Sequence, residues 1–343
     1  MKSPWVNAAV LIILVTLLVT GYFGLVNGEE GRAWRLWLHG VAAYALIVLF
    51  VWKSQVILDA FRRKNKWTRE RVAFAIMLVS LLITVVMGLV WTFNGPVHWG
   101  GFSLVSLHIY LAIPMMLVVV WHIRRMKFIF KVKGTLDRRL FIGTAVSATV
   151  GLLLWRTTDI AKGLTGKLGA ERRFTGSYER GSFTGNFPAT SWIFDYPAPI
   201  DKATWQLKVD GAVQQPLTIG YDDLLAMPAH TADVLLDCTS GWFSTQTWQG
   251  VLLTDLLAQA GLLETAVSVT VTAVSKYNRR FAIDDLDDVF LAYNVADVPL
   301  AHGHGAPVRL VVPQQRGYDW VKWVDHITVN TTSAHLQSPL PLR

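Results

Sequence analysis

The first half of the chain consists of long apolar stretches separated by short polar ones. The apolar stretches cover residues 5–26, 36–58, 72–93, 102–123 and 140–155. Most of them are as long as the roughly 20 helical residues that cross a bilayer, and the fifth is short. A cleavable signal peptide would be one such stretch ahead of a soluble chain, so the pattern instead predicts an all-α membrane bundle of about five transmembrane helices.

Beyond about residue 160 the period of the pattern changes. Apolar and polar residues alternate as they do in half-buried strands, and one stretch has the spacing of a short helix. The predicted strands are 205–211, 267–272, 308–312 and 320–329, and the predicted helix is 252–260. This part is therefore expected to be an α+β domain that is rich in strands.

The region between these two parts differs from both in composition. Residues 161–187 are rich in Gly, Ser, Thr and charged side chains, which is typical of a linker. We therefore expect a transmembrane bundle at 1–160, a linker at 161–187 and a β-rich domain at 188–343.

Charge divides the chain at the same place. Residues 1–160 hold 18 Lys and Arg against 6 Asp and Glu, whereas residues 161–343 hold 14 against 18. The cations gather between apolar stretches, at 62–71 and 124–139, which predicts cytoplasmic loops by the positive-inside rule. Five spans then place the second domain on the outer, periplasmic or extracellular, side of the cell inner (cytoplasmic) membrane. Such loops do not form a nucleic-acid groove, so no nucleic-acid partner is expected.

A pair of arginines precedes the fifth apolar stretch. Residues 137–142 read DRRLFI, with the pair at Arg138 and Arg139. This pattern resembles a twin-arginine export signal, and it equally fits the basic flank of an inward-facing span. Both interpretations stay open.

Histidine is rare within membrane spans, so each one invites a functional interpretation. His108 and His122 lie 14 residues apart on the fourth span, within about 40° of four full helical turns, and therefore share one face. His39 begins the second span, near the same outer end as His108, so this pair can supply both axial nitrogens of one b-type haem. The matching position for His122 is Lys53, which leaves a second haem or a hydrated interfacial histidine as alternatives. Here residues 5–125 resemble the four-helix membrane cytochrome b families.

Only one cysteine occurs in the 343 residues. Cys238 lies in the sequence DCTSGW, directly after the apolar run 234–236. A single thiol cannot form an internal disulfide, a four-cysteine zinc site or an iron–sulfur cluster. It is either inert packing or one soft metal ligand.

Three blocks of the second domain resemble the sulfite oxidase family of molybdenum enzymes. They are 291–300 (LAYNVADVPL), 304–313 (HGAPVRLVVP) and 317–323 (GYDWVKW), within a resemblance that covers about 186–329. The resemblance implies a sulfite oxidase-type molybdopterin-binding fold, with Cys238 as the catalytic thiolate on molybdenum. It also implies a set of residues that contact the cofactor, namely Asn186, Phe187, His304, Arg309, Trp320 and Lys322.

The neighbours of the cysteine depart from the sulfite oxidase pattern. Sulfite oxidases gather arginines at the metal to hold a dianion, whereas this chain has Thr239, Ser240 and Trp242 after the cysteine and Trp192 upstream. Without those charges sulfite would be held poorly. The arrangement is more similar to the catalytic subunit of the bacterial periplasmic methionine sulfoxide reductase, whose substrates are neutral sulfoxides.

These features together predict a membrane-anchored molybdenum oxidoreductase. Electrons from quinol would pass through haem b on His39 and His108 to molybdenum on Cys238 and reduce a small or protein-bound sulfoxide. One alternative reverses the current, with a small sulfur compound oxidised and quinone reduced. A second alternative is a membrane-tethered binding or assembly protein with a degenerate site.

Two further expectations concern the substrate and the assembly. Trp242, Tyr277 and Tyr293 are candidates for the wall of the substrate site. Sulfite oxidases continue into an immunoglobulin-like dimerisation domain, and this chain stops soon after residue 329, so no oligomer is required.

Overall fold

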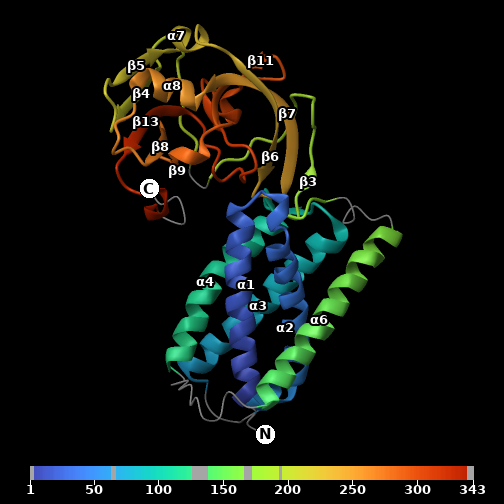
Figure 1. The fold of residues 1–343 in the computed structure, drawn as a ribbon. Coiled ribbons are helices and arrows are strands. Elements are labelled where there is room, and N and C mark those ends of the chain that lie inside the picture. Colours follow the sequence, from blue (N-terminus) through green and yellow to red (C-terminus); the bar gives the residue numbers. More distant parts are fainter. Residues whose placement is uncertain (1–3, 63–66, 126–137, 166–171, 193–194, 338–343) are drawn as a thin grey trace. The chain divides into compact units, whose positions relative to one another are not determined.

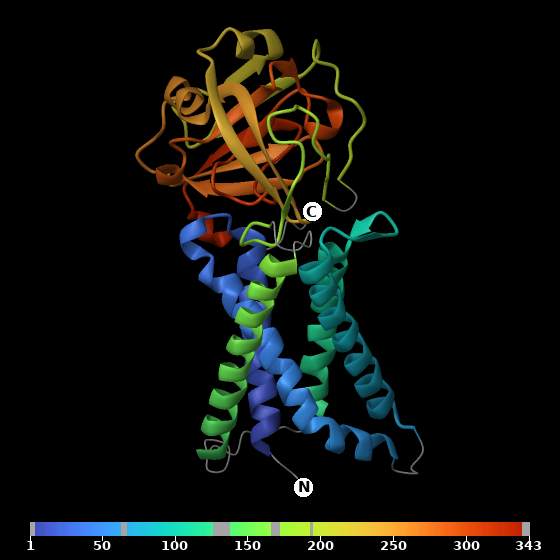
Figure 2. The same ribbon diagram turned by 90° about the vertical axis from the view of Figure 1, so that its right-hand side faces the viewer.

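The computed structural model describes residues 4–62, 67–125, 138–165, 172–192 and 195–337. The chain forms two compact units, shown as ribbons in Figures 1 and 2. The first unit comprises Met1–Leu25 and Glu29–Tyr178, and the second comprises Val26–Gly28 and Glu179–Arg343. The division at Tyr178 falls inside the predicted linker 161–187, of which residues 166–171 lie outside the described residues.

The first unit is built from long helices. They are α1 (Pro4–Val26), α2 (Trp34–Arg62), α3 (Arg69–Asn94), α4 (Leu104–Arg125) and α6 (Arg138–Thr165), with a short helix η1 (Glu30–Arg32) and a hairpin of β1 (His98–Trp99) and β2 (Phe102–Ser103) between them. All five helices are long and apolar enough to cross a membrane. The predicted helices are thus confirmed.

The predicted length of the fifth helix is wrong. Its apolar run suggested a short span, but α6 has 28 residues. The helix continues past Trp155 through polar residues, and the hydroxyls of Thr157 and Thr158 donate to the carbonyls of Leu153 and Leu154, four residues earlier. Such hydrogen bonds satisfy the hydroxyls within the helix itself.

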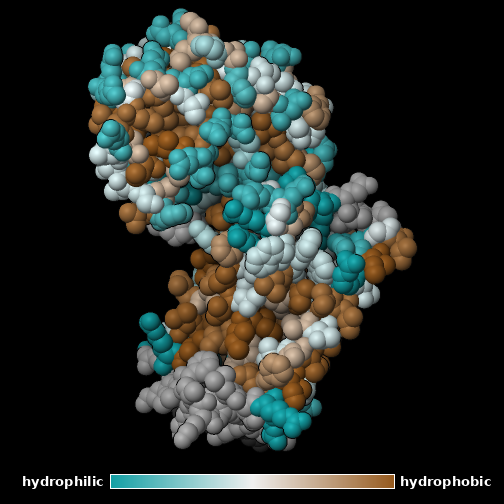
Figure 3. All heavy atoms as spheres, viewed as in Figure 1, coloured by the Kyte–Doolittle hydropathy of each residue, from teal (hydrophilic) through white to brown (hydrophobic). Residues whose placement is uncertain are grey.

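The helices are apolar on their outer faces as well as between them. Ala45 and Leu46 are buried inside the unit, whereas Val51, Leu117 and Phe141 are 70%, 70% and 76% exposed. Figure 3 shows many hydrophobic residues, in brown, on the visible surface of the helices. Water-exposed apolar patches of this size are rare on soluble proteins, and this surface suits lipid.

The second unit contains two sheets. One has the order β11-β10-β7-β3, with β6 paired to β7 and β12 paired to β10, and the other has the order β5-β4-β13-β8-β9. The strands are β3 (Tyr178–Glu179), β4 (Gln206–Gly211), β5 (Leu217–Gly220), β6 (His230–Cys238), β7 (Trp242–Leu252), β8 (Ser268–Ala273), β9 (Asn278–Ala282), β10 (Phe290–Val295), β11 (Val298–Pro299), β12 (Arg309–Val311) and β13 (Val324–Asn330).

Short helices complete the second unit. They are α7 (Tyr221–Leu225), α8 (Leu253–Ala260), η3 (Ile283–Asp285), η4 (His302–His304) and η5 (Ala334–Leu336). The four predicted strands and the predicted helix 252–260 are confirmed, except that the last strand begins at Val324, because residues 316–323 form a loop. This loop contributes to the site described below.

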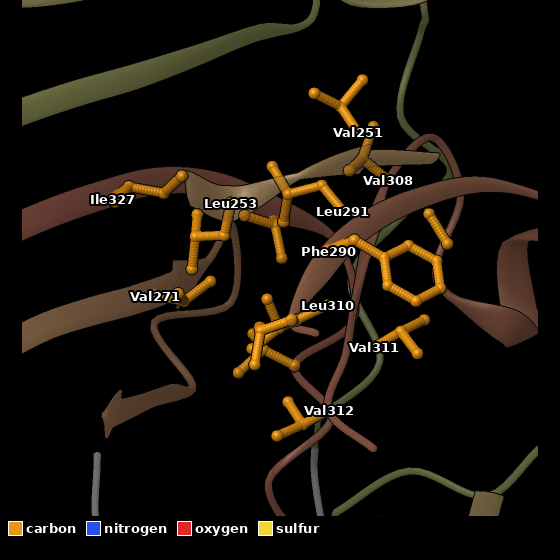
Figure 4. Packing of buried hydrophobic residues seen from close by; sticks show 14 of the residues in the cluster. Val251, Leu253, Val271, Phe290, Leu291, Val308, Leu310, Val311, Val312 and Ile327 are labelled. Atoms are coloured by element: carbon orange, nitrogen blue, oxygen red, sulfur yellow. The ribbon is translucent and has the colours of Figure 1, made fainter. Parts of the chain in front are cut away.

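Strands of both sheets contribute to one hydrophobic core. Leu291 and Leu310 come from the first sheet, Val271 and Ile327 come from the second, and all four are fully buried. Figure 4 shows these side chains close together, with Phe290 among them. Truncating one such leucine to alanine lowers the free energy of unfolding by about 2–5 kcal/mol. This packed core supports the strands whose ends carry the site described below.

Candidate functional site

Cys238 is the last residue of β6, at the start of a tight hairpin. The β6–β7 ladder pairs nine consecutive residues, from His230 opposite Gly250 to Cys238 opposite Trp242. The turn closes with the Gly241 N–H donating to the Cys238 carbonyl at 3.0 Å, and Gly241 has a φ of 93°, a left-handed conformation that favours glycine. The thiol is therefore presented at the end of a well-ordered ladder, with the residue 9% exposed.

Uncharged side chains lie on one side of the thiol. The Ser240 hydroxyl lies 3.1 Å from the Cys238 Sγ, and the Thr190 hydroxyl lies 3.5 Å from that of Ser240. The Trp242 indole donates to the Thr190 hydroxyl at 3.1 Å. This side of the site offers hydrogen-bonding groups without a net charge.

The loop 316–323 passes directly behind the cysteine. Arg316 donates to the Cys238 carbonyl at 3.0 Å, and its guanidinium lies 3.7 Å from the Asp237 carboxylate. The Gly317 N–H donates to the Asp237 carbonyl at 2.7 Å, and a Cβ at Gly317 would lie 3.3 Å from the Cys238 Cα. Arg316 was not predicted, although it is the only charged residue between Arg309 and Asp319.

Arg309 is a buried cation that begins β12. It is 2% exposed, and it donates to the His304 carbonyl at 3.1 Å, while its Nε has no hydrogen-bond partner among the described residues. Its guanidinium lies beside both Trp248 and Trp320, 5.1 and 5.3 Å from the ring centroids. Burial lowers the pKa of Arg309 to about 9, and Cys238 acts in the opposite direction. A guanidinium in this position suits an anion that the protein itself does not supply.

Lys322 lies on the same side of the site. Its ammonium donates to the Thr190 carbonyl at 2.9 Å, the Ser191 hydroxyl at 3.2 Å and the Gly303 carbonyl at 2.5 Å. Burial and the neighbouring Arg309 lower the pKa of Lys322 to about 7. Its three hydrogen-bond partners are neutral, while Cys238 and the Asp195 carboxylate act on the Lys322 pKa in the opposite direction. An anionic ligand would stabilise the ammonium further.

His304 and Phe187 form a stacked pair. Their rings are 4.1 Å apart and within 7° of parallel, and the His304 Nε2 donates to the Phe187 carbonyl at 3.1 Å. Burial, followed by the positive charge of Arg309, lowers the pKa of His304 to about 4. His304 is therefore neutral at pH 7.

Of the remaining predicted residues, Trp320 and Trp242 have described contacts at the site, and the others do not. Trp320 is buried beside Arg309, and its indole N–H has no hydrogen-bond partner among the described residues. Asn186 is exposed on the approach to Phe187. Tyr277 donates to the Tyr318 carbonyl, and Tyr293 is buried on β10; of the three predicted wall residues, only Trp242 has a described contact beside the thiol.

A buried ion pair near this loop was also missed. Arg279 Nε lies 2.7 Å from the Asp319 carboxylate, and the guanidinium lies 4.3 Å from the Tyr318 ring centroid. Each of these two arginines has a carboxylate beside it, Asp319 for Arg279 and Asp237 for Arg316, which offsets its charge near Cys238. The Arg316 Nε and Nη1 have no hydrogen-bond partner among the described residues.

The donor set fits a molybdopterin. A thiolate is a preferred protein ligand of soft metals, and Cys238 provides one. Arg309 and Lys322 are cations whose described hydrogen-bond partners are neutral, and the unpartnered N–H groups of Arg309 and Trp320 can donate to phosphate or pterin oxygens.

His39 and His108 form a second candidate site, in the helical unit. Their ring centroids are 6.3 Å apart. The His39 Nδ1 donates to the Leu17 carbonyl at 3.1 Å, and the His108 Nδ1 donates to the Thr84 carbonyl at 2.8 Å. These bonds fix each ring and leave both Nε2 atoms to bind a metal. Two metal–nitrogen bonds of about 2 Å each fit within the observed separation.

Small residues make room on both sides of this pair. A Cβ at Gly21 of α1 would lie 3.3 Å from the His39 ring, and a Cβ at Gly88 of α3 would lie 3.5 Å from the His108 ring. By contrast, the His122 ring packs against Phe74 at 5.6 Å. Among the described residues, no group of three or more His, Cys, Asp or Glu could hold a metal.

Comparison with known proteins identifies the family of the second unit. The family model described as "Oxidoreductase molybdopterin binding domain" matches residues 194–337. The chain is a molybdopterin-binding oxidoreductase and belongs to this family.

Three relatives show how broad the class is. The chain is 31% identical over 133 residues to the uncharacterized oxidoreductase YuiH of Bacillus subtilis (strain 168). That alignment covers 38% of this chain and 67% of the relative. It is 33% identical over 172 residues to the mitochondrial sulfite oxidase of Rattus norvegicus, with 40% and 32% covered. It is 30% identical over 169 residues to a nitrate reductase (NADH) 1 of Oryza sativa subsp. japonica, with 39% and 18% covered. The chain thus spans a third or less of the length of the latter two relatives.

Proposed function

We propose that the protein is a membrane-anchored molybdenum oxidoreductase that takes electrons from quinol through haem b and reduces a sulfoxide outside the membrane. The observation that carries the proposal is the set of uncharged groups on one side of Cys238, formed by Ser240, Thr190 and Trp242. Reduction of a sulfoxide consumes two electrons and two protons and releases a sulfide and water.

The helical unit supports the membrane anchor. Five helices are long and apolar enough to span a bilayer, and their outer faces expose large hydrophobic side chains. The basic residues at 62–71 and 124–139 favour the cytoplasmic side for the loops that contain them. With that orientation the second unit lies outside the membrane.

The histidine pair supports an electron path through the bundle. When bound, haem b carries single electrons between a two-electron donor and a two-electron acceptor. His39 and His108 would hold it, since their Nδ1 atoms are engaged by carbonyls of α1 and α3 and their Nε2 atoms are not. His122 packs on Phe74, which favours one haem over two.

The molybdopterin-binding residues support oxygen-atom transfer at Cys238. When bound, the molybdenum cofactor supplies two-electron transfer of an oxygen atom. Cys238 would ligate the metal, and Arg309 and Lys322 would hold the anionic end of the pterin. A neutral sulfoxide suits the side of the site formed by Ser240 and Trp242, because their groups next to the thiol are uncharged. The nearby cations Arg309 and Lys322 would be neutralised by the anionic end of the pterin.

The test uses the full chain purified in detergent. Molybdenum and haem are measured first, and we expect one of each per chain. Methionine sulfoxide is then added to dithionite-reduced protein while the haem absorption is followed. Reoxidation is expected in the wild type and not in Cys238→Ala, and no response to any sulfoxide in molybdenum-loaded protein would contradict the proposal.

The second candidate function has the opposite direction of electron flow, and the similarity to sulfite oxidase favours it. In that case a small sulfur compound would be oxidised at Cys238 and quinone would be reduced. Adding sulfite to the oxidised protein distinguishes the two, because haem reduction by sulfite would favour the oxidase. The balanced pairs Arg316–Asp237 and Arg279–Asp319 are the reason that we prefer the reductase.

A further inference from the structure

Arg172 contacts α3 at Thr92, one helical turn from Gly88, the residue of α3 next to the His108 ring. A Cβ at Gly88 would contact the His108 ring at 3.5 Å, and Thr92 follows Gly88 by four residues, with its hydroxyl donating to the Gly88 carbonyl at 2.8 Å. Residues four apart on a helix lie one above the other. Arg172 donates to the Thr92 hydroxyl at 3.4 Å. Its guanidinium therefore contacts α3 one turn after the glycine that lies next to the His108 ring.

The segment that carries Arg172 is fastened to the same helix. Trp91 donates from its indole to the Gly176 carbonyl at 2.8 Å, and Tyr178 donates from its hydroxyl to the Trp91 carbonyl at 2.9 Å. Trp91 is 4% exposed and Tyr178 is 5% exposed. Four described contacts within a few residues therefore hold Arg172 in place, rather than leaving it as a long side chain in solvent.

Arg172 lies near a second cation, Lys162. Lys162 lies 3.3 Å from Asp159, with its side chain 7% exposed, and both residues are close enough to act on Arg172. Among the described residues, the Asp159 carboxylate thus acts on both cations. Burial lowers the pKa of Arg172, and Tyr178, Asp159 and Tyr44 act in the opposite direction. Cations partly removed from water are stabilised by additional anions.

We propose that Arg172, with Lys162 beside it, binds the propionate carboxylates of the haem that His39 and His108 hold. The inference rests on the proposed function, since it requires haem at the histidine pair. A b-type haem carries two carboxylates on one edge, and a guanidinium binds a carboxylate through two parallel hydrogen bonds. The hydroxyl of Thr92 holds the guanidinium at the side of α3 that faces His108.

The experiment compares three variants of the full chain. Arg172→Gln removes the charge, Arg172→Lys keeps it, and Arg173→Gln is the matched control, because Arg173 is the adjacent arginine and lies 3.8 Å from the exposed Glu30. Haem per chain is measured after extended washing in detergent. The haem reduction potential is measured by optical redox titration, which does not depend on turnover.

We expect Arg172→Gln to lose haem on washing and to have a lower reduction potential, because a nearby positive charge stabilises the more electron-rich reduced state. For a charge about 10 Å from the iron, at an effective dielectric of about 20, the equilibrium constant for reduction falls about tenfold. Arg172→Lys should retain most of the potential, and Arg173→Gln should match the wild type in both measurements.

Failure of this inference differs from failure of the proposed function. If the wild type contains haem, and Arg172→Gln keeps its haem and its potential, the role of Arg172 is refuted while the haem site stands. If the wild type contains no haem, or if His39→Ala keeps it, the histidine pair is not the haem site and both proposals are refuted. Arg172→Lys controls for poor folding of Arg172→Gln. A potential that is unchanged in Arg172→Lys and lowered in Arg172→Gln supports the role of the positive charge.

Discussion

The guanidinium of Arg309 lies over the indole ring of Trp248, 5.1 Å from its centroid, inside the core of the second unit. Trp320 approaches the same guanidinium from 5.3 Å, and the two indole rings are 5.5 Å apart. Aromatic faces attract cations. They do not replace a carboxylate, so in the cofactor-free protein Arg309 carries a charge at an energetic cost.

Arg309→Met should have opposite effects on cofactor binding and on stability. Molybdenum content should fall sharply, because a donor to the cofactor is lost. The cofactor-free variant should unfold at the same temperature as the wild type or a higher one, because replacing a buried charge by an apolar side chain of similar size removes a desolvation cost. Metal analysis and thermal unfolding of the same preparations check both. A variant that keeps its molybdenum would contradict the assignment.

Arg279→Met provides the matched control for that experiment. Arg279 is also buried, but it pairs with Asp319 at 2.7 Å. Removing Arg279 leaves a buried carboxylate without its cation, which typically costs about 3–5 kcal/mol. The cofactor-free Arg279→Met protein should therefore unfold at a markedly lower temperature than Arg309→Met. Equal stabilities would mean that the two arginines do not differ as described.

Cys238→Ala should abolish turnover and leave the haem in place, because Cys238 and the histidine pair belong to separate compact units. Ser240→Ala is the comparison, since its hydroxyl lies 3.1 Å from the Cys238 Sγ. Loss of that one hydrogen bond is worth about 1 kcal/mol, so activity should change only several-fold. Turnover with a sulfoxide and the haem absorption of each variant are measured together. Residual turnover in Cys238→Ala would exclude a catalytic role for the thiol.

The stability of the cofactor-free protein should depend on His304 in acid. Its pKa in the folded protein is lowered to about 4, from 6.5 in the unfolded chain. Between these values the unfolded chain binds a proton that the folded protein does not, so stability falls as the pH drops from about 6.5 to 4 and is unaffected by His304 above that range. His304→Gln should show a shallower fall in unfolding temperature across this window. Identical pH profiles for the two proteins would contradict the shift.

His39→Ala and His108→Ala should each lose the haem absorption, whereas His122→Ala should keep it. The ring centroids of His39 and His108 are 6.3 Å apart, and the His122 ring packs on Phe74. Haem per chain, measured on the three purified variants, gives the number of haems directly. Loss of half of the haem in His122→Ala would instead indicate a second site at the inner end of α4.

The elements of the fold were predictable where one local pattern decides them. The apolar runs predicted the five helices, and alternation predicted strands such as β4 and β8. The end of α6 was missed because the helix continues beyond its apolar run into polar residues such as Thr157 and Thr158, whose hydroxyls bond within the helix. The start of β13 was missed because tertiary hydrogen bonds hold residues 316–323 as a loop.

The site was predictable only in part. Arg309 and His304 lie in a block that the family resemblance covers, and the structure joins them through a hydrogen bond of 3.1 Å. Arg316 meets the Cys238 carbonyl across 78 residues of sequence, and Arg279 meets Asp319 across 40. Such pairings depend on how distant strands come together, so no local pattern in the chain reveals them.

The β6–β7 hairpin has a consequence for evolution and for engineering of this chain. Side chains on a strand alternate between the two faces of the sheet, and nine paired residues lead up to Cys238. Inserting or deleting one residue between His230 and Cys238 would therefore turn the sulfur to the opposite face, while every residue of the site remained in the sequence. The length of this strand is as strict a requirement for metal binding as the cysteine itself.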